Sequence, residues 1–331
     1  MLTSNISISQ WSNDPSENLK VLHSCINPWI VSDGDGGAII VGWSLTINPM
    51  LYAQRVDKYG NILWDPTLRG IRVSTVGDEQ WKQIMAPDGN GGVYIGFQEM
   101  NIIGRWDEPP EPIYSSLVRI QHIDADGKLL LGQEGLPLYL NPIDSLAASQ
   151  TLYSMVSDNL GGVYVLWADL YGPQGFDRYV TYISPNGHIS WENSVALNAS
   201  NYTVVERDFF MYVDENNGLI LYIHDYPNHR LVRINNNGEV TFEKIMDIEL
   251  SPFFLFSATD GECILFWQDF TQSSNPDTIR CQKIDRNGEK LWGAEPIIID
   301  SSGIVKNPIF IGIASDLRGG AYISYYHYND T

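Results

Sequence analysis

Short apolar runs, each preceded by a polar turn, recur along the whole chain. The clearest copy is 157–167, where Ser-Asp-Asn-Leu-Gly-Gly leads into Val-Tyr-Val-Leu-Trp. The turn Asp can bond its own backbone two residues on, and the first Gly tolerates the left-handed conformation. The apolar run is too short for a stable helix and is apolar on both faces, so we predict a strand covered on both sides. Equivalent turns begin at Asp33, Asp88, Asp214 and Asp316, with a degenerate copy at Asp260.

A second pattern lies between the copies of the first. In 54–64, a strand-like run is followed by Asp57-Lys58-Tyr59-Gly60 and then by Asn-Ile-Leu-Trp. A polar turn that ends in Gly between two apolar runs is typical of a β-hairpin. Relatives of this pattern occupy 121–131, 181–191, 232–242 and 282–292. The two patterns together predict four strands per repeat, joined in chain order as an antiparallel meander.

The repeats predict the architecture of the chain. The first complete repeat gives strands at Trp29 to Ser32, Gly37 to Trp43, Leu51 to Asp57 and Ile62 to Val73. Repeats of this length and strand content are typical of β-propeller blades. We therefore predict an all-β, six-bladed β-propeller of four-stranded antiparallel blades, forming a single domain over 1–331. The expected blades are about 27–75, 82–140, 151–198, 206–248, 252–300, and 304–331 completed by the N-terminus.

The two ends of the chain are expected to share one blade. The last repeat ends after two predicted strands, and 1–26 resembles the end of a repeat. Leu2 to Trp11 carries no charge and is rich in β-branched and small polar residues. An incomplete sheet exposes an edge that invites pairing, so we expect this N-terminal strand to pair with the C-terminal blade and close the ring. Donation of the same strand to a neighbouring molecule is the alternative, so monomer and self-assembly both stay open.

One stretch resembles a known repeat family. Ser32 to Trp64 is similar to a widespread bacterial propeller repeat with Asp-x-x-Gly-Gly, an apolar strand ending in Trp, a Tyr-Ala-Gln-Arg-like strand and Gly-x-x-x-Trp. The resemblance extends over nearly the whole chain and implies the fold, but no activity. Proteins with such repeats are often exported or on the cell surface, so it favours an extracellular or cell-surface location. Ser184 to Trp191 has a shape similar to the Asp-box of sialidases but the wrong spacing, so we do not assign the chain to that family.

Composition narrows the classes of partner. The formal net charge is −20, which disfavours nucleic acid and anionic membranes because both need a basic footprint. No stretch approaches the roughly 18 apolar residues of a membrane helix, and the chain's start carries no signal-peptide pattern. The three cysteines, Cys25, Cys263 and Cys281, are too few for a disulfide framework. Cys263 and Cys281 fall on consecutive predicted strands and could face each other, as buried free thiols.

The connections between second and third strands carry the candidate binding chemistry. Long insertions at 99–114, 170–176 and 271–277 lie on the face opposite the tight Gly turns, and loops on a rigid scaffold commonly carry function. Aromatic rings beside carboxylates suit sugar stacking or a cation held by ring faces, although they can also simply pack the loops. Recurrent acids at the strand ends could form a ring or bond loop backbone. The candidate ligand-binding residues are Glu99, Arg105, Trp106, Asp107, Tyr114, Asp169, Tyr171, Phe176, Asp225, Asp269 and Phe270.

Catalytic and metal chemistry have weaker support in the sequence. The histidines show no paired metal spacing, and no Gly-x-Ser-x-Gly nucleophile elbow exists. Asp33-Gly-Asp35 and Asp124-Ala-Asp126 resemble fragments of calcium loops, but neither has a distant bidentate acid. We expect no cofactor, with Ca²⁺ as the alternative. The sequence favours a non-catalytic binding or scaffold propeller with a glycan or protein ligand on the long-loop face. A glycan-active lyase or hydrolase, and a structural subunit assembling through an incomplete blade, are the alternatives.

Overall fold

The computed structural model of the chain divides into two compact units, Met1–Ala199 (unit 1) and Ser200–Thr331 (unit 2). The residues that it describes are 14, 16, 18–45, 49–105, 112–138, 149–158, 160–172, 175–191, 194–197, 209–225, 228–246, 252–257, 261–269, 278–300, 308–316 and 318–327. The expected closing strand, Leu2 to Trp11, lies outside these residues.

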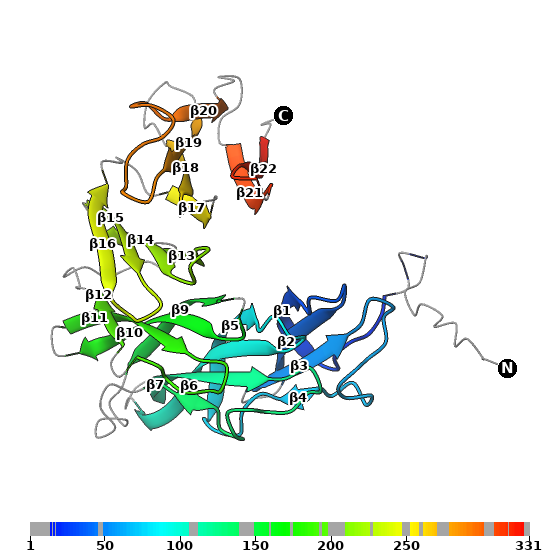
Figure 1. Cartoon of the computed structure of the whole chain (residues 1–331). Coiled ribbons are helices and arrows are strands. Elements are labelled where there is room, and N and C mark those ends of the chain that lie inside the picture. The colour runs from blue at the N-terminus through cyan, green and yellow to red at the C-terminus, as the bar shows by residue number, and fades with distance from the viewer. Residues whose placement is uncertain are drawn as a thin grey trace. The chain divides into compact units, whose positions relative to one another are not determined.

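Unit 1 contains three four-stranded antiparallel sheets whose strands pair in chain order (Figure 1). Sheet 1 comprises β1 (Cys25–Ser32), β2 (Ala38–Ser44), β3 (Leu51–Val56) and β4 (Ile71–Arg72). Sheet 2 comprises β5 (Glu79–Pro87), β6 (Val93–Arg105), β7 (Pro112–Ile123) and β8 (Leu136–Pro137). Sheet 3 comprises β9 (Gln150–Ser157), β10 (Val163–Gly172), β11 (Gly175–Ile183) and β12 (Val195–Leu197). The first strands of consecutive sheets contact each other, β1 with β5 and β5 with β9.

Unit 2 repeats this arrangement in two four-stranded sheets and one two-stranded sheet. Sheet 4 comprises β13 (Phe209–Val213), β14 (Leu219–Asp225), β15 (Asn228–Ile234) and β16 (Val240–Met246). Sheet 5 comprises β17 (Pro252–Ser257), β18 (Cys263–Asp269), β19 (Thr278–Ile284) and β20 (Ile297–Asp300), and β21 (Pro308–Ser315) pairs with β22 (Ala321–His327). The predicted all-β architecture of four-stranded antiparallel sheets is confirmed, and it is consistent with a β-propeller. Within the described residues, no helix is long and apolar enough to cross a membrane.

The hydrophobic core lies between consecutive sheets of each unit. In β6, Val93, Ile95 and Phe97 pack against sheet 1, whereas Tyr94 packs against sheet 3. All four side chains are fully buried, and burying an apolar side chain of this size contributes about 1.5–3 kcal/mol. The central strand therefore needs apolar residues on both faces, as its sequence predicts.

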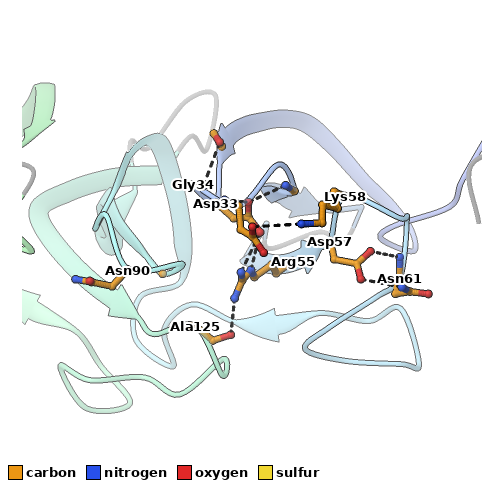
Figure 2. Close-up of polar contacts among 12 residues, drawn as sticks. Asp33, Gly34, Arg55, Asp57, Lys58, Asn61, Asn90 and Ala125 are labelled. Atoms are coloured by element: carbon orange, nitrogen blue, oxygen red, sulfur yellow. Dashed lines mark hydrogen bonds and ion pairs between the residues drawn. The ribbon is translucent and has the colours of Figure 1, made fainter. Parts of the chain in front are cut away.

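The turn aspartate links three parts of the chain (Figure 2). In sheet 1, Asp33 accepts the backbone N–H groups of Asp35 and Gly37 at 2.9 and 2.8 Å. Its second oxygen accepts the Arg55 guanidinium of β3 at 2.9 Å. Arg55 also donates to the carbonyl of Ala125, in the turn that follows β7 of sheet 2, at 3.1 Å. One carboxylate thus fixes its own turn, the third strand and, through Arg55, the neighbouring sheet.

The same turn in the next two sheets uses different donors. In sheet 2, Asp88 contacts the Nε2 atom of His122 at 2.9 Å. The His122 ring stacks on Tyr94 with centroids 4.0 Å apart, and the Tyr94 hydroxyl donates to the carbonyl of Gly161 in sheet 3 at 2.7 Å. In sheet 3, the hydroxyl of Tyr182 donates to Asp158 at 2.6 Å.

The two glycines of the turn are required for different physical reasons. The first takes the left-handed conformation, with φ of 81° at Gly36 and 87° at Gly91, and Asn217 takes this role in sheet 4 with φ of 58°. The second glycine is required by space, because a Cβ on Gly37 would lie 2.3 Å from the carbonyl oxygen of Val56. The left-handed conformation expected of the first glycine is confirmed.

The fourth strand is shorter than predicted because a buried glutamine side chain forms hydrogen bonds with the backbone that follows the hairpin. Gln54 is fully buried. Its Oε1 accepts the Trp64 N–H at 3.1 Å, and its Nε2 donates to the carbonyl of Asp65 at 2.8 Å. Trp64 and Asp65 bond to this side chain, whereas Leu63 still donates to the Arg55 carbonyl of β3. The strand predicted from Ile62 to Val73 is therefore only Ile71–Arg72, plus an isolated bridge at Ile62. Gln121 and Gln282 make the equivalent bonds in sheets 2 and 5.

The insertion predicted at 99–114 is largely a continuation of the β6–β7 hairpin. Ile102 pairs with Tyr114, and Arg105 pairs with Pro112. The ladder therefore runs beyond the end of β5, whose pairing with β6 ends at Met100. Over 99–105 and 112–114, the described part of the insertion, the chain is two paired strands.

Cys263 and Cys281 do not face each other. Cys263 lies in the core between sheets 4 and 5, and Cys281 lies on the opposite face of sheet 5, in the core shared with β22. Both are free and buried, as expected, and burial raises the pKa of the Cys263 thiol to about 12 and that of Cys281 to about 11. The arrangement in which they could face each other across the strands is therefore not found, whereas the expectation of buried free thiols is confirmed.

We predict that Asp33→Ala lowers the free energy of unfolding by about 3 kcal/mol, because it leaves Arg55 without its buried partner. Asp35→Ala is the matched control. The Asp35 side chain is 81% exposed and forms only a surface ion pair with Lys58, so its loss is expected to cost less than about 1 kcal/mol. Urea unfolding of both variants measures the difference, and equal losses would contradict the role given to the Asp33 carboxylate.

We also predict an acid-dependent loss of stability at Asp88. Burial alone would raise the Asp88 pKa, but hydrogen bonds from His122 and from the amides of Asn90 and Gly92, with the His122 charge, lower it on balance. Its contribution is therefore full above the unfolded pKa of about 3.9 and is lost as the pH falls through the lower folded value. The difference in unfolding free energy between wild type and Asp88→Asn should shrink below pH 4 or so. A constant difference down to pH 2 or so would exclude this linkage.

Candidate functional site

Four side chains from sheets 1 and 2 form an aromatic–carboxylate cluster: Trp43, Glu79, Trp81 and Tyr114. Trp43 lies near the end of β2, Glu79 and Trp81 near the start of β5, and Tyr114 near the start of β7. Because strands alternate in direction, all four positions are on the face opposite the tight Gly turns. The cluster therefore lies on the long-loop face where the sequence predicts binding.

Glu79 is the polar centre of this cluster. Its Oε2 accepts the indole N–H of Trp81 at 2.7 Å, and its Oε1 accepts the hydroxyl of Tyr114 at 3.4 Å. The rings of Trp43 and Trp81 meet edge-on, with centroids 4.7 Å apart and an interplanar angle of 72°. The Trp81 side chain remains 38% exposed, so a large aromatic surface and a carboxylate are presented together to solvent.

Buried hydrogen bonds position the start of β5. Gln80 is fully buried; its Oε1 accepts the Leu51 N–H of β3 at 3.0 Å, and its Nε2 donates to the carbonyl of Ser74 at 3.2 Å. Fixing Gln80 against sheet 1 holds the backbone from which its neighbours Glu79 and Trp81 project. The cluster is thus held by a rigid element.

Trp43 contributes an unmet hydrogen-bond donor. Its indole Nε1 is buried and has no hydrogen-bond partner among the described residues. A buried donor left unsatisfied costs about 1–3 kcal/mol. A ligand oxygen that accepted this N–H would remove that cost.

Of the predicted site residues, Tyr114 belongs to the cluster and Glu99 is engaged elsewhere. Glu99 is buried and forms an ion pair with Arg119 within sheet 2, and it also accepts the side-chain amide of Asn101 at 2.8 Å. Arg119 in turn donates to the carbonyl of Gly135 at 3.2 Å. The sequence suggests that Glu99 joins a ring of acids or bonds to loop backbone. In the structure its partner is the Arg119 side chain instead.

The other predicted residues are distributed over several sheets. Asp169 lies at the end of β10 and pairs in register with Asp177 of β11. For the next group only the backbone is described, and it lies in strands β6, β10, β11, β14 and β18: Arg105, Tyr171, Phe176, Asp225 and Asp269. Trp106, Asp107 and Phe270 lie outside the described residues.

The sequence reading missed three members of the cluster. In the sequence, Trp43 is only the last residue of the repeated apolar strand. Glu79 and Trp81 precede the expected start of the second blade at 82, in a stretch to which no strand was assigned. The alternation Glu-Gln-Trp, with a buried Gln between two outward residues, is the signal that could have identified them.

The first carboxylate of each calcium-like fragment is bound to its own turn. Asp33 accepts N–H groups from Asp35 and Gly37, and Asp124 accepts N–H groups from Asp126 and Lys128. Over the described part of the chain, no group of three or more His, Cys, Asp or Glu side chains is arranged to hold a metal ion.

Comparisons with solved structures give only distant likenesses. No family model matches the chain, and no curated protein matches it. A protein of unknown function from Dyadobacter fermentans is 13% identical, with 94% of this chain and 92% of that chain covered and a TM-score of 0.48. The NanB sialidase of Streptococcus pneumoniae is 8% identical, with 96% and 67% covered and a TM-score of 0.48. An endo-arabinase from Bacteroides thetaiotaomicron is 14% identical, with 93% and 92% covered and a TM-score of 0.39.

We predict that the two acids at this end of sheet 2 differ in their effect on stability. Glu99→Ala leaves Arg119 buried without its charge partner, so the free energy of unfolding should fall by about 3 kcal/mol. Glu79→Ala removes a partly exposed carboxylate and should cost about 1 kcal/mol or less. Chemical denaturation measures both values. A larger loss for Glu79→Ala would show that the cluster is a packing element of the fold.

Proposed function

We propose that the chain is a non-catalytic glycan-binding module built on a six-bladed β-propeller, with the sugar held at the aromatic–carboxylate cluster. The observation that carries the proposal is the pairing of Glu79 with the exposed indole of Trp81. A pyranose presents an apolar C–H face and a rim of hydroxyl groups. The Trp81 ring suits the apolar face, since exposed aromatic side chains combine an apolar body with a polar edge.

The polar groups of the cluster match a ligand that both donates and accepts. Glu79 is an acceptor for sugar hydroxyls, and the Trp43 N–H is a donor that lacks an acceptor. A small number of placed polar groups on a largely apolar surface is the usual composition of a small-molecule site. The alternative ligand for a binding module is a protein that contacts the same face.

The arrangement of acids favours binding over hydrolysis. Most glycoside hydrolases use a pair of carboxyl groups that flank the scissile bond. In the cluster, Glu79 is the single carboxylate, and the nearby Glu99 is held by Arg119 inside sheet 2. We therefore expect a ligand to be bound and released unchanged.

A glycan array followed by calorimetry on the best ligand tests this function. Trp81→Ala should weaken binding by about tenfold, since stacking on an aromatic ring contributes on the order of 1 kcal/mol or more. Its melting temperature should change little. Trp292→Ala is the matched control, because Trp292 is similarly exposed but lies on the Gly-turn face of sheet 5 in unit 2.

Three results would change the proposal. Equal losses of affinity in both tryptophan variants would remove the cluster from the site. A fall in melting temperature as large as the loss of binding in Trp81→Ala would make Trp81 a packing residue. Chromatographic detection of shortened or unsaturated products from the bound glycan would establish the glycan-active enzyme instead.

The six-blade count and the closure of the ring are part of the proposal. Five described sheets have four strands, and the last has only β21 and β22, so the N-terminal strand is proposed to complete it. Deleting 1–12 should then lower the melting temperature of the monomer by several degrees or more, because a closing strand is lost. If the deletion leaves the melting temperature of the monomer unchanged but removes a larger species from the size-exclusion profile, the strand pairs with a neighbouring molecule. The chain is then a structural subunit.

A further inference from the structure

Glu79 is a carboxylate whose contacts are with uncharged groups. Its Oε2 accepts the Trp81 indole N–H at 2.7 Å, and its Oε1 accepts the Tyr114 hydroxyl at 3.4 Å. Among the described residues, no basic side chain forms an ion pair with it. Glu99 at the same end of sheet 2 differs, because it is paired with Arg119. The negative charge of Glu79 is therefore not neutralised within the described part of the chain.

Both oxygens of Glu79 can accept further hydrogen bonds. An ionised carboxylate has about four lone-pair sites, and the bonds from Trp81 and Tyr114 use one on each oxygen. An ammonium group carries three donors and no acceptor, whereas a hydroxyl group carries one donor. Hydrogen bonds between two ionised groups are also stronger than those between a carboxylate and a neutral donor. An ammonium is thus the complementary group for this carboxylate.

The aromatic members of the cluster suit the same kind of group. Ring faces carry partial negative charge and attract a cation within about 6 Å of the ring centroid. The rings of Trp43 and Trp81 lie with centroids 4.7 Å apart, and the Trp81 side chain is partly exposed. An ammonium bonded to Glu79 is brought close to aromatic surface, because the carboxylate is itself bonded to two of the aromatic side chains.

Trp43 requires that the ligand carry an oxygen as well. Its buried indole N–H has no acceptor among the described residues, and an ammonium alone cannot accept a hydrogen bond. An amino sugar has hydroxyl and ring oxygens beside its ammonium group. It therefore offers acceptors to Trp43, donors to Glu79 and an apolar C–H face to Trp81.

The charges around the cluster favour a cation. The formal net charge of −20 attracts cationic ligands and repels anionic ones. A second acid, Asp78, precedes Glu79, and its carboxylate accepts the Ile102 N–H at 2.8 Å. The one basic residue of β5, Lys82, donates to the hydroxyl of Thr151 in sheet 3 and not to Glu79.

We propose that the aromatic–carboxylate cluster selects sugars with a free amino group, whose ammonium is held by Glu79, so that the ligand is a cationic glycan of de-N-acetylated amino sugars. This inference rests on the proposed glycan-binding function and adds the chemical class of the glycan. The competing role for Glu79 is to orient the Trp81 ring without touching the ligand. In that role, removing the charge changes the affinity for cationic and neutral sugars by the same factor.

Matched ligand pairs separate these two roles. The probes are glucosamine and galactosamine oligosaccharides, each with its N-acetylated form. Calorimetry is carried out on the full chain with wild type, Glu79→Gln and Asp35→Asn. Gln keeps the side-chain length and an oxygen that can accept the Trp81 N–H, so the charge is what is lost. Asp35→Asn removes an equal charge from the Gly-turn face of sheet 1, where the Asp35 side chain is 81% exposed.

Wild type should bind the amino form of at least one pair about tenfold more tightly than its acetylated form. This preference should fall as salt rises, since it comes from charge. Glu79→Gln should bind the two forms of that pair with equal affinity, whereas Asp35→Asn should keep the preference.

Two sets of results would overturn the inference but leave glycan binding in place. The first is a preference retained in Glu79→Gln, and the second is equal or tighter binding of the acetylated forms by wild type. Binding of a lysine oligopeptide that depends on Glu79, without binding of either amino glycan, would assign the ammonium to a protein partner and overturn the inference too. The absence of any ligand on the glycan array would remove the proposed function itself.

Discussion

In sheets 1, 2 and 3 the turn aspartate bonds to a donor on the third strand, and from sheets 1 and 2 this contact continues to the next sheet. Hydrophobic burial supplies most of the free energy of folding, but it does not fix how one sheet is turned relative to its neighbour. The Asp33 carboxylate does so through Arg55, whose second hydrogen bond reaches Ala125 of sheet 2. The Asp33 carboxylate is almost wholly buried in a charged form, so each of its lone pairs must accept a hydrogen bond. This requirement determines which residues can surround it.

Much of the fold could be predicted from the sequence because its causes are local. The left-handed glycine and the crowded second glycine are both set within a few residues of the aspartate, so the turns were placed correctly. The apolar character of both faces of Val93 to Phe97 likewise follows from a strand between two sheets. The fourth strand could not be predicted in the same way. Its length depends on Gln54, a polar residue in an apolar strand, whose amide bonds to backbone ten and eleven residues later.

The candidate site was harder to predict than the fold for a related reason. The sequence places the candidate residues on loops, whereas the residues of the cluster come from strand ends in two sheets. Their contacts depend on how those sheets pack. Glu99 appeared available because its position in the repeat is near a loop. In the structure Arg119, twenty residues later, neutralises it. Trp81 precedes the expected second blade, and the alternation that places it is interrupted by a register shift between Trp81 and Ile84.

The donors at the third-strand position differ from one repeat to the next, and this difference affects whether the repeats assemble in the correct order. Neighbouring repeats of similar sequence can exchange places during folding, and misassembly of this kind is a known failure of repeat proteins. Here the link from sheet 1 to sheet 2 is a guanidinium reaching a carbonyl, whereas the link from sheet 2 to sheet 3 is a phenol supported by an imidazole. A repeat that docked in the wrong place would bring a donor of the wrong length and leave a buried acceptor unsatisfied. The donor at each of these two junctions therefore fits only the correct neighbouring sheet, although the turns on either side are nearly the same.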